Sequence, residues 1–333
     1  MALRYVEIVL PCSECDTVQA WVEELEVVDL WHGRIDDQRM TVCAVVEAGQ
    51  TEPLLDAFER RMGALDGFRA IVQLVEATIP RPPEPEKKPP EEKPAPKQKV
   101  GSVSREELLA SLAPGMRVTP IYLVTILLSA IVAAVGLVRG NVAVIIGAMV
   151  IAPLLTPNMA LALATTLGDI DHARKAFRTL VIGGLVALGF AVLVGLVLKV
   201  DPSIPEIHSR TSPHLSDFVV ALASGAAGAL AFTTGMSASL VGVMVAVALL
   251  PPLVVVGLLL GGGHYALSIE AATLFAINVI CVNLAAVLTF LWRGVRPLQW
   301  WEKDKARRHT RRAMLLWACL LLALIALVLR SQR

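Results

Sequence analysis

The residues that could most readily form a binding site lie in an apolar stretch that spans 141–166. Pro153 and Pro157 lie in its middle, with Thr156 and Asn158 beside them. A proline inside a helix removes one backbone hydrogen bond and clashes with the preceding turn, and in lipid the freed carbonyls must find other partners. We therefore predict a broken membrane helix whose exposed backbone faces protein or water, where a solute or ion could bind.

The same pattern of residues occurs a second time, 95 residues further along the chain. Residues 146–157 read IGAMVIAPLLTP, and residues 241–252 read VGVMVAVALLPP. Pairs of glycine, methionine and proline count most here, because other apolar residues often match by chance. These pairs are Gly147 with Gly242, Met149 with Met244, and Pro157 with Pro252. We interpret the two stretches as an internal repeat, and Pro251 next to Pro252 predicts a second broken helix.

Apolar segments after residue 118 predict about seven membrane-spanning helices, since each needs about 20 apolar residues. They lie near 119–138, 141–166, 179–198, 216–232, 239–260, 269–292 and 314–330. The 95-residue offset groups the first six into two units of three helices. Because three is odd, the second unit must be inverted relative to the first, as in many secondary transporters. The expected fold is a polytopic α-helical membrane protein with an inverted 3+3 repeat.

The predicted spans carry few polar groups that could bind a solute. No Asp, Glu, Lys or Arg lies deep in a span, which argues against a proton relay through the membrane. Broken helices instead offer backbone N–H groups to an anion and carbonyls to a cation. Asn278 and Asn283 lie about 140° apart around one helix, so they need not share a site, and each could simply hydrogen-bond between helices.

The candidates for a solute path combine the two proline stretches with these asparagines. They are Gly147, Met149, Pro153, Thr156, Pro157, Asn158, Gly242, Met244, Pro251, Pro252, Asn278 and Asn283.

Residues 1–79 have the pattern of a small soluble α+β domain. Apolar alternation predicts strands at 3–10, 27–35, 40–47 and 68–79, and helical spacing predicts helices at 16–25 and 52–65. This βαββαβ order is the ferredoxin-like arrangement. A fold so widely used does not by itself indicate a function.

Cys12 and Cys15 form a C-x-x-C motif in the first turn of that domain. Two thiolates from one turn could bind Cu(I) or Zn, but no His follows at zinc-ligand spacing, and two reduced thiols are the plainer interpretation. We expect no other metal and no cofactor. Nothing resembles a Ser/His/Asp triad, an HExxH motif or a P-loop, so we do not expect an enzyme and assign no catalytic residue.

A Pro-rich charged linker at 80–103 separates this domain from the rest of the chain. Ser104 and Glu107 form a capping box that predicts an amphipathic interfacial helix over 104–116, and the transmembrane domain follows at 117–333. Hydrophobic residues make up 55% of the chain, above the roughly 45–50% of soluble domains. A net charge of +1 indicates no nucleic-acid partner.

The basic residues predict how the chain is oriented in its membrane. Lys and Arg gather at 168–178 and at 293–312, whereas the loops expected on the opposite side hold few. Basic loops lie in the cytoplasm. We therefore expect a multi-pass protein of the cell inner (plasma) membrane, with its N-terminal domain in the cytoplasm and its C-terminus outside.

Three segments carry a resemblance to a known family. VIIGAMVIAPLLTPNMALALATTLGD at 144–169, ALLPPLVVVGLLLG at 248–261 and LFAINVICVNLAA at 274–286 resemble the bacterial and archaeal membrane proteins of domain of unknown function 389. The resemblance covers roughly 119–292 and implies a membrane location. It implies no substrate and no catalytic residue.

Two functions fit these patterns. The first is a transporter or channel for a small solute or ion, with the path between two proline-broken helices and with a cytoplasmic domain that regulates or oligomerises the protein as a homo-oligomer. The second is a membrane sensor or scaffold that transports nothing and whose soluble domain binds a ligand, metal or partner. A transporter needs a cavity at Pro153–Asn158 and at Pro251 and Pro252, whereas an anchor should be tightly packed there.

Overall fold

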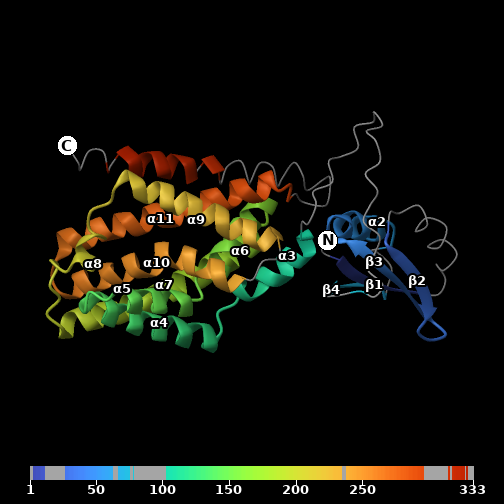
Figure 1. Cartoon of the computed structure of the whole chain (residues 1–333), viewed down its shortest axis with the longest axis horizontal. Coiled ribbons are helices and arrows are strands. Elements are labelled where there is room, and N and C mark those ends of the chain that lie inside the picture. Colours follow the sequence, from blue (N-terminus) through green and yellow to red (C-terminus); the bar gives the residue numbers. More distant parts are fainter. Residues whose placement is uncertain are drawn as a thin grey trace. The chain divides into compact units, whose positions relative to one another are not determined.

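The computed structural model describes residues 3–11, 27–62, 67–75, 78, 103–234, 238–295, 314–315, 317–326 and 328, with the side chains of 238–248 excepted. The chain divides into two compact units, Met1–Glu107 and Leu108–Arg333 (Figure 1). Each is described by itself. The predicted first helix, at 16–25, lies outside the described residues.

The first unit is built on a four-stranded antiparallel sheet. Its strands are β1 (Leu3–Pro11), β2 (Asp29–Arg34), β3 (Arg39–Glu47) and β4 (Arg69–Val75), in the order β2-β3-β1-β4. Helix α2 (Thr51–Met62) packs its Phe58 onto one face of the sheet, against alternate residues of β1 and β3 such as Ile8 and Val42. All four predicted strands and the second predicted helix are confirmed.

Helix α3 (Arg105–Leu112) begins at the predicted capping box. The Ser104 Oγ accepts a hydrogen bond from the backbone N of Glu107 at 3.2 Å, and the Glu107 Oε2 accepts one from the backbone N of Ser104 at 3.2 Å. The other oxygen of Glu107 accepts from the Nε of Arg4 on β1 at 2.8 Å. One carboxylate therefore caps the helix and neutralises a guanidinium that is 5% exposed.

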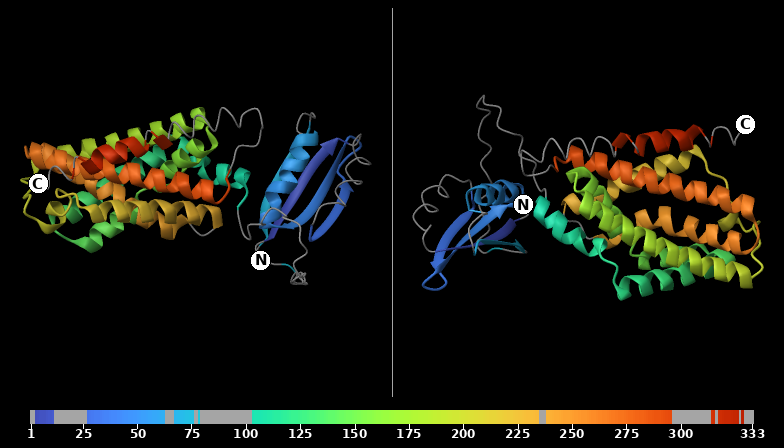
Figure 2. Two further views of the ribbon diagram at one scale, coloured as in Figure 1. Left: turned by 90° about the horizontal axis from the view of Figure 1, so that it is seen from above. Right: turned by 180° about the vertical axis from the view of Figure 1, so that it is seen from behind.

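The second unit is a bundle of helices (Figures 1 and 2). After the short 3-10 turn η3 (Ala113–Met116) come α4 (Pro120–Val138), α5 (Val142–Ile151), α6 (Leu155–Leu167), α7 (Ile170–Val197), α8 (Pro205–His208), α9 (Leu215–Thr234), α10 (Ala238–Gly261) and α11 (Tyr265–Trp292). Among the described residues, four helices are long and apolar enough to cross a membrane, or five if the bent pair α5 and α6 is one span. Leu249–Gly261 and Trp317–Ala326 form shorter apolar helices.

The predicted break in the first proline stretch is confirmed. Helices α5 and α6 are separated by 152–154 and bent by 55°. Pro153 lies in the break, where it has no helical hydrogen bond to interrupt. Pro157 is the third residue of α6, and the first four N–H groups of a helix have no partner within it. Both prolines therefore fit the position at which one helix ends and the next begins.

The predicted break in the second proline stretch is wrong. Helix α10 is one element from Ala238 to Gly261, and Pro251 and Pro252 lie inside it. A helix tolerates proline in a membrane protein when neighbouring helices accommodate the freed backbone groups. Both prolines are buried, which agrees with such support.

Helix α7 begins earlier than predicted. Gly168 ends α6 with a left-handed φ of +70°, and Asp169 caps α7 by accepting a hydrogen bond from the backbone N of His172 at 3.0 Å. Arg174, Lys175 and Arg178, predicted to lie in a loop, are therefore in the first turns of α7.

Small residues allow helices to approach closely. A Cβ added at Gly225 of α9 would overlap the carbonyl oxygen of Val282 on α11, and one added at Gly195 of α7 would overlap that of Leu258 on α10. Such contacts are typical of membrane helices, where packing replaces the hydrophobic effect as the source of association.

Gly225→Ala should destabilise the helical unit by about 1–3 kcal/mol, because the obstacle is backbone that cannot rotate away. The measurement is thermal unfolding of the purified chain in one detergent. Gly189→Ala on α7 is the matched control, since a Cβ there meets nothing within 4 Å. It should leave the melting temperature unchanged or slightly raised. Equal melting temperatures for both variants would contradict this view of the packing.

Candidate functional site

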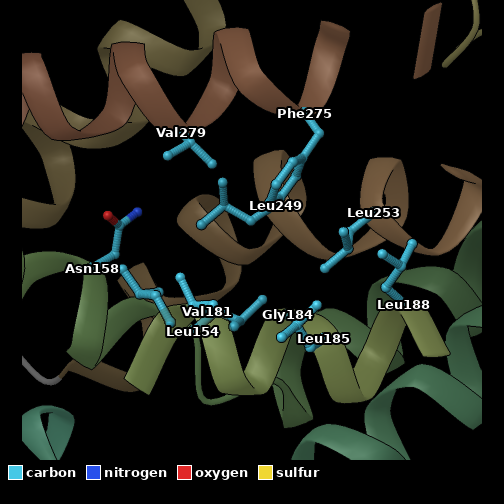
Figure 3. A pocket seen from close by; sticks show the side chains of 11 residues that line it. Leu154, Asn158, Val181, Gly184, Leu185, Leu188, Leu249, Leu253, Phe275 and Val279 are labelled. Carbon is cyan, nitrogen blue, oxygen red and sulfur yellow. The ribbon is translucent and has the colours of Figure 1, made fainter. Parts of the chain in front are cut away.

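A cavity of about 260 Å³ lies beside the break between α5 and α6 (Figure 3). Leu154 and Asn158 contribute from the start of α6, and the other residues come from α7, α10 and α11. The lining consists of Leu154, Asn158, Leu180, Val181, Gly184, Leu185, Leu188, Leu249, Leu253, Phe275 and Val279. Asn158 is therefore the one polar side chain among these lining residues, and none of them is charged.

The break determines where Asn158 lies. Helix α6 begins at Leu155, which places Asn158 at the end of its first turn, with its backbone N donating to the carbonyl of Leu154 at 3.4 Å. The backbone of η3 supports this turn closely, since a Cβ added at Gly115 would lie 2.7 Å from the nitrogen of Pro157. The start of α6 is thus held by packing of backbone on backbone.

Asn158 forms a hydrogen bond with a second predicted residue, Asn283 of α11. The Asn283 Nδ2 donates to the Asn158 Oδ1 at 2.5 Å and to the carbonyl of Val279 at 3.0 Å. The bond to Val279 requires a donor, so it identifies the nitrogen of the Asn283 amide, which in turn requires the Asn158 oxygen to face it. The orientation of both amides follows from one backbone carbonyl.

Each of these amides keeps one polar atom that has no hydrogen-bond partner. They are the Asn158 Nδ2 and the Asn283 Oδ1, and both side chains are 1% exposed. A buried polar group left without a partner costs about 1–3 kcal/mol. An unused donor and an unused acceptor in one buried pair indicate a place where a small polar group can bind.

Among the predicted path residues whose side chains the structure describes, Asn158 lines the cavity and the others, Asn283 included, do not. Pro157, Pro251 and Pro252 are buried, as are Met149 and Asn278, whereas Pro153, Thr156 and Gly147 are half-buried. For Gly242 and Met244 on α10, side-chain surroundings lie outside the described residues, and so do Cys12 and Cys15. The structure thus brings together Asn158 and Asn283 out of the larger predicted set.

Sequence reasoning missed most of the cavity, because its signal in the sequence is too weak to recognise before the structure is known. Eight of the eleven lining residues form four pairs whose members are 95 residues apart, the offset of the predicted repeat. The pairs are Leu154 with Leu249, Asn158 with Leu253, Leu180 with Phe275, and Gly184 with Val279. Leucine and valine carry little weight as isolated matches, so only their place around one cavity makes the pairs evident.

Comparison with known protein families identifies the same part of the chain that forms the cavity. The profile of the family described as Domain of unknown function (DUF389) matches residues 149–284, which include both asparagines and the whole lining. The chain is similar to the Uncharacterized protein MJ0678 of Methanocaldococcus jannaschii, with 33% identity over 332 residues and 99% of each chain covered. No solved structure matches the chain.

The hydrogen bond between the two asparagines can be tested by a double-mutant cycle. Asn158→Leu and Asn283→Leu should each destabilise the protein, because each leaves the other amide buried with fewer partners. The double variant should lose less than the sum, with a coupling energy of about 1 kcal/mol. The measurement is the free energy of unfolding in mixed micelles.

The matched control is Asn158→Leu combined with Thr289→Val. Thr289 is also buried on α11, but its hydroxyl donates within its own helix, to the carbonyl of Ala285 at 2.8 Å. The effects of this pair should add. Additive effects in both cycles would mean that the two asparagines do not interact.

Proposed function

The chain belongs to the family of domain of unknown function 389, and from this premise we propose that it is a membrane transport protein for a small uncharged solute that binds in the cavity beside Asn158. The main support for this proposal is the lining of the cavity. Eight of its residues form four pairs whose members lie 95 positions apart in the sequence. In transporters built from inverted repeats, the solute binds at the interface of the repeats, near a discontinuous helix.

The packing of the helices supports an internal repeat, with two related halves inside the second unit. Under the 95-residue offset, α4 corresponds to α9, the pair α5 and α6 to α10, and α7 to α11. Helix α7 packs against α10, and in the same relation α11 packs against α6. The third helix of each half (α7 or α11) thus packs on the second, proline-containing segment of the other half. This is the arrangement expected for two interlocked repeats related by a two-fold axis.

The chemistry of the lining favours an uncharged solute over an ion. An ion that leaves water needs charges or several polar groups to replace its hydration. The cavity offers one amide among otherwise apolar side chains. The continuous α10 also means that the second proline stretch provides no helix ends, which removes one of the two predicted ion sites.

The proposal includes the arrangement in the membrane. Seven spans follow if α5 with α6, α10 and the helix near 317–326 each cross once, in addition to the four long helices. The concentration of Lys and Arg at 168–178 and 293–312 then favours a cytoplasmic N-terminal domain and an outer C-terminus in the inner membrane. The N-terminal domain would regulate transport or form the contact of a homo-oligomer.

Transport is tested by uptake into proteoliposomes, with uncharged solutes of graded polarity followed by light scattering and ions followed by dyes. Uptake of an uncharged solute should saturate. Leu253→Trp fills the cavity and should lower the rate at least about tenfold, which corresponds to about 1.4 kcal/mol.

Val150→Trp is the control for this experiment, because it introduces the same ring on α5 at a position that is 61% exposed and outside the lining. Its uptake should equal that of the parent protein. Uptake of ions alone, or equal uptake by both tryptophan variants, would argue against the cavity as the solute site.

The competing function is a sensor or scaffold, and one observation in the first unit favours it. Trp31 of β2 and Tyr5 of β1 have ring centroids 5.9 Å apart, and Trp31 is 44% exposed. Tyr5 alternates with the core residues of β1, so it lies on the sheet face opposite to α2. A ligand could stack there. Absence of uptake for every solute by a folded protein would favour this function.

A further inference from the structure

The two ends of the cavity differ in polarity. Asn158 lies at one end with Asn283 bonded to it, and the 95-residue offset relates these two residues to Leu253 and Leu188. Figure 3 shows Leu253 and Leu188 at the opposite end from Asn158. A site with the Asn158 amide at one end and leucines at the other suits an elongated molecule with one polar end.

The polar end determines which head group can bind. In Figure 3 the nitrogen of the Asn158 amide lies on the side of the other lining residues, and this nitrogen is the donor without a partner. The unpartnered oxygen of Asn283 belongs to the same amide pair. Asn283 is not among the lining residues, so the head group is selected by the Asn158 nitrogen, from which a hydroxyl oxygen can accept and an ammonium, which only donates, cannot.

The absence of charge among the lining residues excludes ionised head groups. Burial of a carboxylate or an ammonium without a partner of opposite charge is far more costly than burial of a hydroxyl. Since the lining residues include no charged side chain, the head group should be neutral.

The cavity opens along α7. Val181 and Leu185 both line it and are 41% and 61% exposed, so its wall reaches the outer surface of the bundle at these residues. Helix α7 is one of the four helices that are apolar and long enough to span a membrane. A molecule dissolved in the bilayer would therefore reach the opening directly.

The volume limits the length of the tail. An engineered cavity of about 150 Å³ holds benzene, and the cavity here has about 260 Å³. Aliphatic and aromatic side chains provide the rest of the wall, so an alkyl chain of medium length fits it in size and chemistry.

We propose that the cavity binds an uncharged amphiphile with one hydroxyl head group and a medium-length alkyl tail, with the hydroxyl at Asn158 and the tail toward Leu188 and Leu253, and that this molecule enters from the bilayer along α7. This assignment rests on the proposed function, because it names the class of solute that the protein would transport. Its test measures binding without transport.

The experiment is photolabelling of the full chain in nanodiscs of saturated phosphatidylcholine. The probe is octanol that carries a diazirine in its chain, and the comparison probes replace the hydroxyl by hydrogen, by a carboxylate or by an ammonium. Mass spectrometry should find the label on peptides of α7 and α10 that contain cavity residues. The alcohol should label these peptides about five- to tenfold more strongly than the hydrocarbon, the effect of one hydrogen bond.

Two variants separate the two ends of the site. Asn158→Leu should abolish the preference for the alcohol over the hydrocarbon. Leu253→Phe should shift the preferred alcohol to a shorter chain and keep the preference for the hydroxyl, which remains informative if the first variant does not fold. Val150→Leu, at an exposed position outside the lining, should label like the parent protein.

Equal labelling by alcohol and hydrocarbon, stronger labelling by either charged probe, or label away from the cavity would overturn the assignment. Saturable uptake of another solute that depends on Leu253, without alcohol labelling, would leave the transport function and remove this ligand class. Alcohol labelling that depends on Asn158, without uptake of any solute, would keep the ligand class and remove transport.

Discussion

The hydrogen bond from Asn283 to Asn158 joins helices α11 and α6 inside an apolar interior. Both amides are 1% exposed, so water cannot replace either partner without entering the bundle. Since a buried amide without a partner is costly, the position of α6 relative to α11 is constrained by this bond. The cavity lies beside this bond, with Asn158 and Leu253 of α10 both in its lining.

The break before α6 makes this arrangement possible. A continuous helix through 141–166 would have no helix N-terminus in the middle of this stretch. The observed chain bends by 55° between α5 and α6, so that the first turn of α6 lies in the interior. Helix α10 contains two adjacent prolines and remains one element. The two proline stretches therefore differ in backbone, since the first is broken and the second is continuous.

The 95-residue spacing of similar residues explains why sequence alone could identify the region but not the site. Gly147 and Gly242 or Met149 and Met244 reveal the 95-residue offset because these residue types match rarely. The residues that line the cavity are mostly leucine and valine, which match too often to be recognised. Asn158 and Asn283 are 125 residues apart rather than 95, so no pattern along the chain indicates that they touch.

Composition and periodicity alone determined the apolar helices, the four strands, the capping box at Ser104 and the break at Pro153, because each depends on residues that are close in sequence. Only the tertiary structure decided that α10 continues through Pro251 and Pro252, since that depends on support from neighbouring helices. It also decided that one asparagine of α11 meets Asn158 and that four helices leave a cavity between them. These features depend on contacts between residues up to 125 positions apart, which no local pattern specifies.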